Sequence, residues 1–127
     1  MILGSLPGVS VDFSKATKLR EVTFRFYRGY VAWVTMALKT ITPAHRDLRQ
    51  ISIHIPVRAK DTLSEEICRQ WTELDCTLVR LWESRAIIVM GVYGVERVEW
   101  KAVCEYIQGL LPQMTRRGGI EIVNCIG

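Results

Sequence analysis

The chain has 127 residues, of which 49% are hydrophobic and 24% are charged, and its net charge at neutral pH is +4. This length matches one domain, residues 1–127, and a chain of this size buries enough surface to fold without a metal ion or a disulfide. The composition excludes a disordered tail. Beyond residue 12 no uncharged run is longer than ten residues, the length of the runs 29–38 and 86–95. Such runs are too short to cross a bilayer, so we expect no membrane association.

The charges and cysteines also exclude several kinds of site. The basic residues are dispersed, with Arg116-Arg117 as the longest cluster, and this makes nucleic acid an unlikely partner. Cys68 and Cys76 lie about 12 Å apart along one predicted helix, too far for one zinc ion or one disulfide to join them. We expect no metal and no cofactor. Because no secretory signal is visible, we expect reduced thiols and a location in the cytoplasm or nucleus.

The first half of the chain predicts one irregular segment, one strand and one helix. Glycine and proline near the start indicate that residues 1–18 form an irregular segment or a cap. Apolar and polar residues alternate over 22–27, which is typical of a strand. Val31, Val34, Leu38 and Ile41 then recur at the three- and four-residue spacing of a helix, which should end at Thr42-Pro43.

A second strand and a second helix follow. Isoleucines alternate with Ser52 and His54 over 51–55, and Pro56 ends this strand. Thr62-Leu63-Ser64-Glu65 forms a capping box, which predicts the start of a helix over 63–84. Tryptophans lie on or beside the apolar stripes of the predicted helices, and we expect them to pack inside the molecule more readily than to anchor a partner: Trp33, Trp71 and Trp82.

The last part of the chain repeats the pattern. The run 86–92 is apolar at every position, as in a buried parallel strand, and Gly91 and Gly94 should close it. A helix over 100–114 should kink or restart at Pro112 and stop at Gly118-Gly119. A short final strand begins at residue 120.

The order of elements is β-α-β-α-β-α-β, which predicts an α/β fold with a parallel sheet. The polar positions of the first two strands make one sheet face hydrophilic. Helices should therefore lie mainly on the other face. The competing architecture is a doubly wound sheet with helices on both faces, and the uniformly apolar third strand favours it.

The strands start near residues 22, 51, 87 and 120, a period of about thirty to thirty-six residues that is typical of repeat proteins. Leu19-x-x-Val22-x-Phe24 and Leu48-x-x-Ile51-x-Ile53 fit the apolar skeleton of a leucine-rich repeat. Ser84-x-x-Ile87-x-Val89 and Arg117-x-x-Ile120-x-Ile122 fit it at two positions of three. The asparagine of that repeat is absent.

Four stretches resemble the C-terminal part of uncharacterised fungal proteins related to F-box proteins with leucine-rich-repeat-like domains. They are Asp12–Leu19, Thr40–Ile51, Leu81–Arg85 and Leu110–Gly118. The resemblance implies a repeat scaffold that binds a partner protein and carries no catalytic residues. It does not extend to an F-box, because the sequence has no F-box-like helical segment near its N-terminus.

The repeat register predicts which side chains lie on the open sheet face. One row is Thr23, Ser52, Ile88 and Glu121, and the other is Arg25, His54, Met90 and Val123. Basic and hydroxyl groups beside an apolar patch suit a peptide or protein partner. These residues, apart from Val123, are the predicted partner-binding set.

His54 is the one candidate base on a predicted strand, but Glu121 lies two strands away, beyond hydrogen-bond range. No catalytic residue is therefore expected, and the function we predict is a non-enzymatic protein-interaction module, the terminal part of a repeat scaffold. The alternative is a small α/β enzyme or ligand-binding domain with a pocket at the strand ends near Tyr27, Pro56 and Gly91. Uncovered edge strands also predict edge-to-edge self-association.

Overall fold

The computed structural model describes residues 2–4, 12–25, 31–56, 65–93 and 96–125. Its centre is a five-stranded, wholly parallel sheet in the order β1-β2-β3-β4-β5. The strands are β1 (Ile2–Gly4), β2 (Glu21–Arg25), β3 (Gln50–Pro56), β4 (Ile87–Tyr93) and β5 (Ile120–Cys125). The helices are α1 (Val31–Lys39), α2 (Glu65–Glu83), the short 3₁₀ turn η1 (Arg97–Glu99), α3 (Trp100–Leu110) and α4 (Pro112–Arg116).

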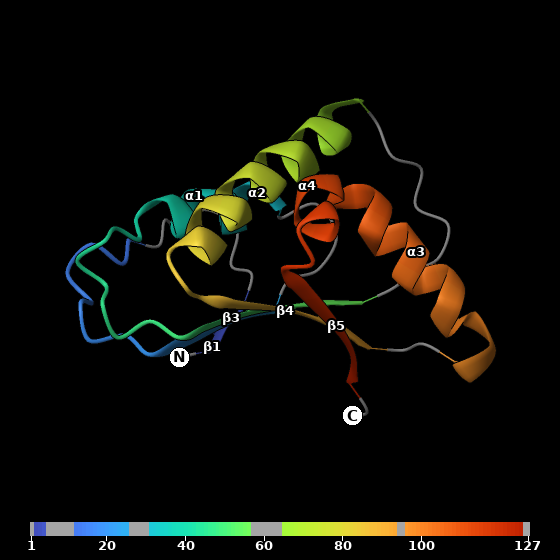
Figure 1. Ribbon diagram of the computed structural model, residues 1–127, viewed down its shortest axis with the longest axis horizontal. Coiled ribbons are helices and arrows are strands. Elements are labelled where there is room, and N and C mark those ends of the chain that lie inside the picture. The colour runs from blue at the N-terminus through green and yellow to red at the C-terminus, as the bar shows by residue number, and fades with distance from the viewer. Residues whose placement is uncertain (1, 5–11, 26–30, 57–64, 94–95, 126–127) are drawn as a thin grey trace.

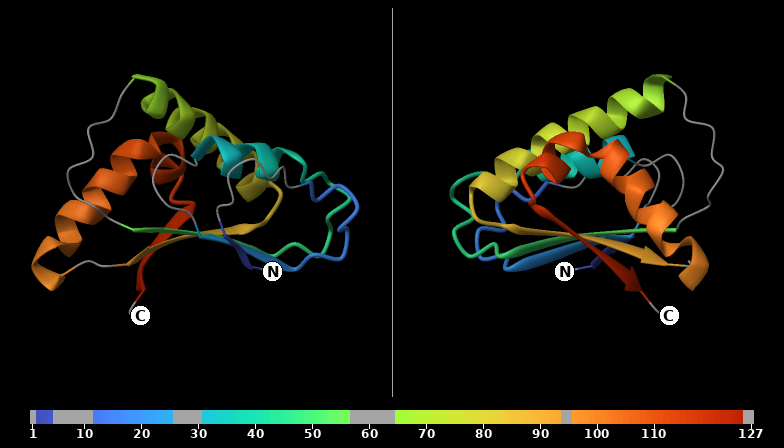
Figure 2. Two further views of the ribbon diagram at one scale, coloured as in Figure 1. Left: turned by 180° about the vertical axis from the view of Figure 1, so that it is seen from behind. Right: turned by 45° about the vertical axis from the view of Figure 1, so that its right-hand side comes forward.

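The helices α1 to α4 lie on one side of the sheet, and the other side is bare (Figure 1). Both additional views show the same two layers (Figure 2). The one-sided α/β arrangement is thus confirmed, and the doubly wound alternative is wrong for the described residues. The alternation of polar and apolar positions in β2 and β3 explains this result, because only one face of each strand is apolar enough to hold a helix layer.

The core fills the space between the sheet and the helices. Val22 and Phe24 of β2 and Ile51 and Ile53 of β3 are fully buried there. The tryptophans take part in this packing, as expected: Trp71 is buried, and Trp33 and Trp82 pack against the core. Trp33 stands edge-on to Phe24, with ring centroids 5.9 Å apart.

Helix α2 holds the ends of two neighbouring helices. Asp75 is 1% exposed, and its carboxylate accepts the backbone N–H groups of Gln113 (2.8 Å) and Met114 (3.0 Å) at the start of α4. Arg80 donates to the carbonyls of Leu38 (3.4 Å), in the last turn of α1, and Ile41 (3.2 Å), just beyond it. A negative group thus meets a helix N-terminus and a positive group a helix C-terminus, as the helix dipole favours.

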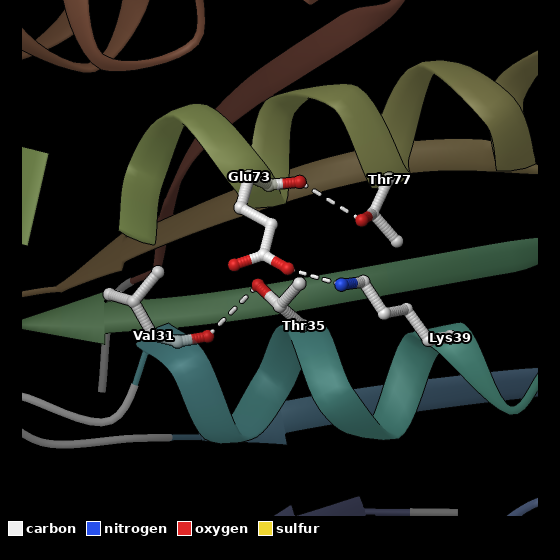
Figure 3. Close-up of polar contacts among 5 residues, drawn as sticks. All are labelled: Val31, Thr35, Lys39, Glu73 and Thr77. Carbon is white, nitrogen blue, oxygen red and sulfur yellow. Dashed lines mark hydrogen bonds and ion pairs between the residues drawn. The ribbon is translucent and has the colours of Figure 1, made fainter. Parts of the chain in front are cut away.

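The contact between α1 and α2 combines an exposed ion pair with buried hydroxyls. Lys39 of α1 reaches across to Glu73 of α2, as Figure 3 shows. Beneath this pair, Thr35 and Thr77 are buried, and each hydroxyl donates to the carbonyl four residues earlier in its own helix. Because the hydroxyls are satisfied locally, small threonines can line the interface without leaving a buried polar group unpaired.

Two successive turns lead into β2 and recur before β3. The backbone N–H groups of Ala16 and Leu19 each donate to the carbonyl three residues earlier. The N–H groups of His45 and Leu48, 29 positions later, do the same. His45 is buried and ties the two turns together, because its Nε2 donates to the Phe13 carbonyl at 2.6 Å while its Nδ1 accepts the Thr42 N–H at 3.0 Å. The segments that lead into β2 and β3 therefore share one backbone hydrogen-bond pattern.

The C-terminal helices follow the sequence prediction closely. The predicted restart at Pro112 is confirmed, since α3 ends at Leu110 and α4 begins at Pro112. The predicted stop is confirmed as well: Gly118 has a φ of 65°, and Gly118 and Gly119 donate back to Thr115 and Met114. The capping box over Thr62–Ser64 lies outside the described residues. The structure starts α2 at Glu65, close to the expected position.

Two expectations need correction. Residues 1–18 were expected to contain no strand, yet Ile2–Gly4 forms β1 and pairs in parallel with β2. Gly91 was expected to close the third strand, but it lies inside β4, which continues to Tyr93. In the described residues, no helix is long and apolar enough to span a membrane.

Candidate functional site: the open sheet face

The strand register places most of the predicted partner-binding residues on the bare side of the sheet. Thr23 pairs with Ser52, and Arg25 pairs with His54. Ser52 pairs in turn with Val89, and Val89 pairs with Glu121. We call this side the open face and define it by Glu21, Thr23, Arg25, Gln50, Ser52, His54, Pro56, Ile87, Val89, Gly91, Tyr93, Glu121, Val123 and Cys125.

Ile88 and Met90 were assigned to the open face, and this assignment is wrong. They pair with Ile51 and Ile53, point into the helix layer and are both 0% exposed. Their open-face places are taken by Val89 and Gly91. The strand is apolar on both sides, so its hydrophobic pattern fits either register, and a shift of one residue exchanges the two faces.

The centre of the open face is tightly packed although no helix covers it. Ser52 is only 5% exposed, and its hydroxyl accepts a hydrogen bond from the Gln50 side chain at 3.0 Å. Val89 beside it is also buried, whereas Ile87 at the start of β4 is 55% exposed. The face therefore offers an apolar contact at Ile87 next to polar and charged groups, a mixture typical of protein-binding surfaces.

His54 is half-buried on this face. Its own burial, and secondly the neighbouring positive charge of Arg25, lower the pKa of the imidazole below its ordinary value. The ring is therefore neutral at neutral pH. Glu121 lies on β5, two strands from His54, and it pairs with Val89, whereas His54 pairs with Gly91. The register therefore agrees with the sequence argument that His54 and Glu121 do not form a pair.

A different neighbour of His54 was missed by sequence reasoning. A Cβ atom built on Gly91 would lie 2.9 Å from His54 Nε2 and 2.8 Å from Cys125 Sγ. Both side chains thus lean over the same glycine from the two adjacent strands. The available signal was the isolated glycine in a strand, which commonly marks a close approach of another group.

The described residues contain no group of three or more histidines, cysteines or acidic residues that could hold a metal ion. Among the described residues, surface hollows occur at two basic segments away from the open face. One, of about 450 Å³, is lined by Gln113, Arg116 and Arg117, and the other, of about 440 Å³, by residues 15–19. Neither includes Pro56 or Gly91, where the alternative function would place a pocket. Tyr27 lies outside the described residues.

Comparison with known proteins gives no match: no protein-family model, no curated protein and no solved structure corresponds to this chain.

Proposed function

We propose that this chain is a non-enzymatic protein-interaction module, the terminal part of a leucine-rich-repeat-like scaffold, and that it binds its partner through the open face. The carrying observation is the sheet face that no described helix covers, with exposed Ile87 beside Gln50 and Ser52. A sheet covered on one side by helices presents its other side as a continuous, rigid surface. The resemblance to F-box-related repeat proteins supports the same function.

The partner that suits this surface is a protein segment with an apolar side chain for Ile87 and polar groups beside it. Hydrogen bonds to Thr23 and Gln50 would surround the apolar contact, because such surfaces bind through a small apolar centre and a polar rim. Charge alone does not select the partner, since Arg25 and Glu121 carry opposite signs on the same face.

A photo-crosslinking amino acid at single positions tests this proposal. We expect a crosslinker at Ile87 to join a discrete partner in cells of the source organism, and one at Val98 to join none. Val98 is a matched control because it is also an exposed β-branched residue, 87% exposed, but belongs to η1 beside the helix layer.

Binding of the captured partner to purified variants then tests whether the partner binds through the open face. Ile87→Glu should weaken its affinity by about tenfold or more, as loss of an interface anchor does, and Val98→Glu should leave it unchanged. Equal binding by both variants, or loss with Val98→Glu alone, would contradict the proposal.

The alternative of a small α/β enzyme or ligand-binding domain ranks second. Its one specific support is the approach of His54 to Cys125 near the carboxyl ends of β3 and β5, where ligands of parallel sheets bind. A third group for acid–base or metal chemistry would be needed beside them, and no cluster of three such groups lies within the described residues.

A further inference from the structure

Gly91 brings a thiol and an imidazole together on the open face. Cys125 Sγ and His54 Nε2 both lie within 3 Å of one point above the glycine, so the two atoms are less than twice that distance apart. The three residues come from the adjacent strands β3, β4 and β5. A side chain larger than hydrogen at position 91 would occupy the space in which the pair meets.

The ionisation states suit proton transfer from the thiol to the ring. His54 is neutral at neutral pH, because burial and then Arg25 lower its pKa. In the tautomer with its hydrogen on Nδ1, the ring accepts a proton at Nε2, the atom that faces Gly91. A thiolate is the nucleophilic form of cysteine, and a neighbouring base promotes its formation.

We propose that Cys125 is a site of thiol modification by low-molecular-weight disulfides, with His54 as the base that activates it. Nε2 takes the proton of Sγ–H, and the thiolate attacks one sulfur of the disulfide. A new S–S bond forms to Cys125 while the disulfide's own S–S bond breaks. The other half leaves as a thiolate and takes the proton from the imidazolium, so the exchange balances without a further oxidant.

The other cysteines provide internal controls. Cys68 and Cys76 are exposed on α2, while Cys125 is half-buried, so accessibility alone would make the α2 thiols react first. Burial, and secondly Glu105, raise the pKa of the Cys104 thiol, which makes it the slowest of the set. A faster reaction at Cys125 would therefore follow from its neighbour and not from its exposure.

Three further charged or titratable groups face the pair: Arg25 from β2, Tyr93 from β4 and Glu121 from β5. Arg25 disfavours the imidazolium, which keeps the base neutral, and it attracts an anionic disulfide. Glutathione disulfide is such an anion and is the probe for the experiment. The proposal does not depend on the protein partner of the preceding section, because the reaction is measured on the isolated chain.

The experiment measures mixed-disulfide formation at each cysteine by mass spectrometry after timed exposure of the full chain to glutathione disulfide at pH 7. In the wild type, Cys125 should react several times faster than Cys68. His54→Gln should slow Cys125 by about tenfold or more, the lower end of the range for loss of a general base, and should leave Cys68 unchanged. The pH–rate profile of Cys125 should then shift to that of Cys68.

Gly91→Ala should slow Cys125 in the same way, because its methyl group would meet both side chains, whereas Gly109→Ala should not. Gly109 is the matched control, since a Cβ there meets nothing within 4 Å. Thermal melts establish that each variant is folded. If Gly91→Ala does not fold, His54→Gln alone tests the proposal. A wild-type Cys125 no faster than Cys68, or an unchanged rate in His54→Gln, would overturn the proposal.

Discussion

At the residue scale, the stability of the helix layer depends on two charged side chains of one helix. Asp75 satisfies two backbone N–H groups at the start of α4, a short helix whose own N-cap, Leu111, has no side-chain acceptor. Arg80 satisfies carbonyls in the last turn of α1 and just beyond it. These contacts link segments 38 to 42 positions apart in the sequence, so they fix how the helices sit on one another as well as where they end.

We expect Asp75→Asn to lower the free energy of unfolding by about 2 kcal/mol. The amide can accept one of the two N–H groups but turns its own donor toward the other, which leaves a buried donor unpaired. Glu73→Gln on the same helix should cost about 0.5 kcal/mol or less, because the Lys39–Glu73 ion pair is half-exposed on both sides. Urea unfolding followed by circular dichroism checks this. Equal midpoints for the two variants would contradict it.

At the element scale, β4 decides which side chains the open face presents. Residues 86 to 90, at the start of this strand, are all apolar. The sequence pattern therefore allows either face of β4 to be buried. The structure selects the register in which Ile88 meets Ile51 and Ile120. Arg85 has a φ of 77°, and this left-handed residue between α2 and β4 sets the direction in which the strand leaves the helix.

We expect Ile88→Lys to unfold the protein or to cost about 4 kcal/mol or more, because an ammonium group would enter the core without a partner. Ile87→Lys should cost about 1 kcal/mol or less, since more than half of that side chain already meets water. Thermal melts of the two single variants measure the difference. If Ile87→Lys proved the more damaging of the two, the register of β4 would be reversed.

The orientation of β2 and β3 could be predicted from the sequence, whereas for β4 only the presence of a strand could be predicted. In β2 and β3, the polar residues Thr23, Arg25 and Ser52 mark the face that lies away from the helices. Both the strands and their orientation therefore follow from the sequence pattern. In β4 no polar residue does this, and the error at Ile88 and Met90 follows directly. The approach of His54 to Cys125 joins residues 71 positions apart, and only the strand order and the glycine between them reveal it.

At the scale of the whole molecule, the helix layer covers β5 less completely than it covers the middle of the sheet. The helix-facing residues of β3 and β4 are fully buried, whereas Ile120 and Ile122 of β5 are only partly buried. In the described residues β5 has a neighbour on one side alone. A half-covered apolar layer beside an unpaired strand edge is a place where another chain or another repeat can pack.

We expect the isolated chain to self-associate through this end in a concentration-dependent manner, because pairing there covers Ile122 and the free strand edge together. Ile122→Lys should shift the equilibrium toward monomer by placing a charge in the contact. Met36→Lys is the control, since Met36 is 65% exposed on α1. Size-exclusion chromatography with light scattering checks the masses. A wild-type chain that remains monomeric at every accessible concentration would contradict this expectation.

The sheet order also has a consequence for how such a chain can change in length. In the described residues, each strand pairs only with strands that are next to it in the sequence, so the chain never returns to an earlier position in the sheet. One more strand–helix unit, added at either edge, would displace no existing hydrogen bond and could extend the same apolar layer. The architecture is therefore additive, because each added unit would lengthen the sheet and its open face by the same step.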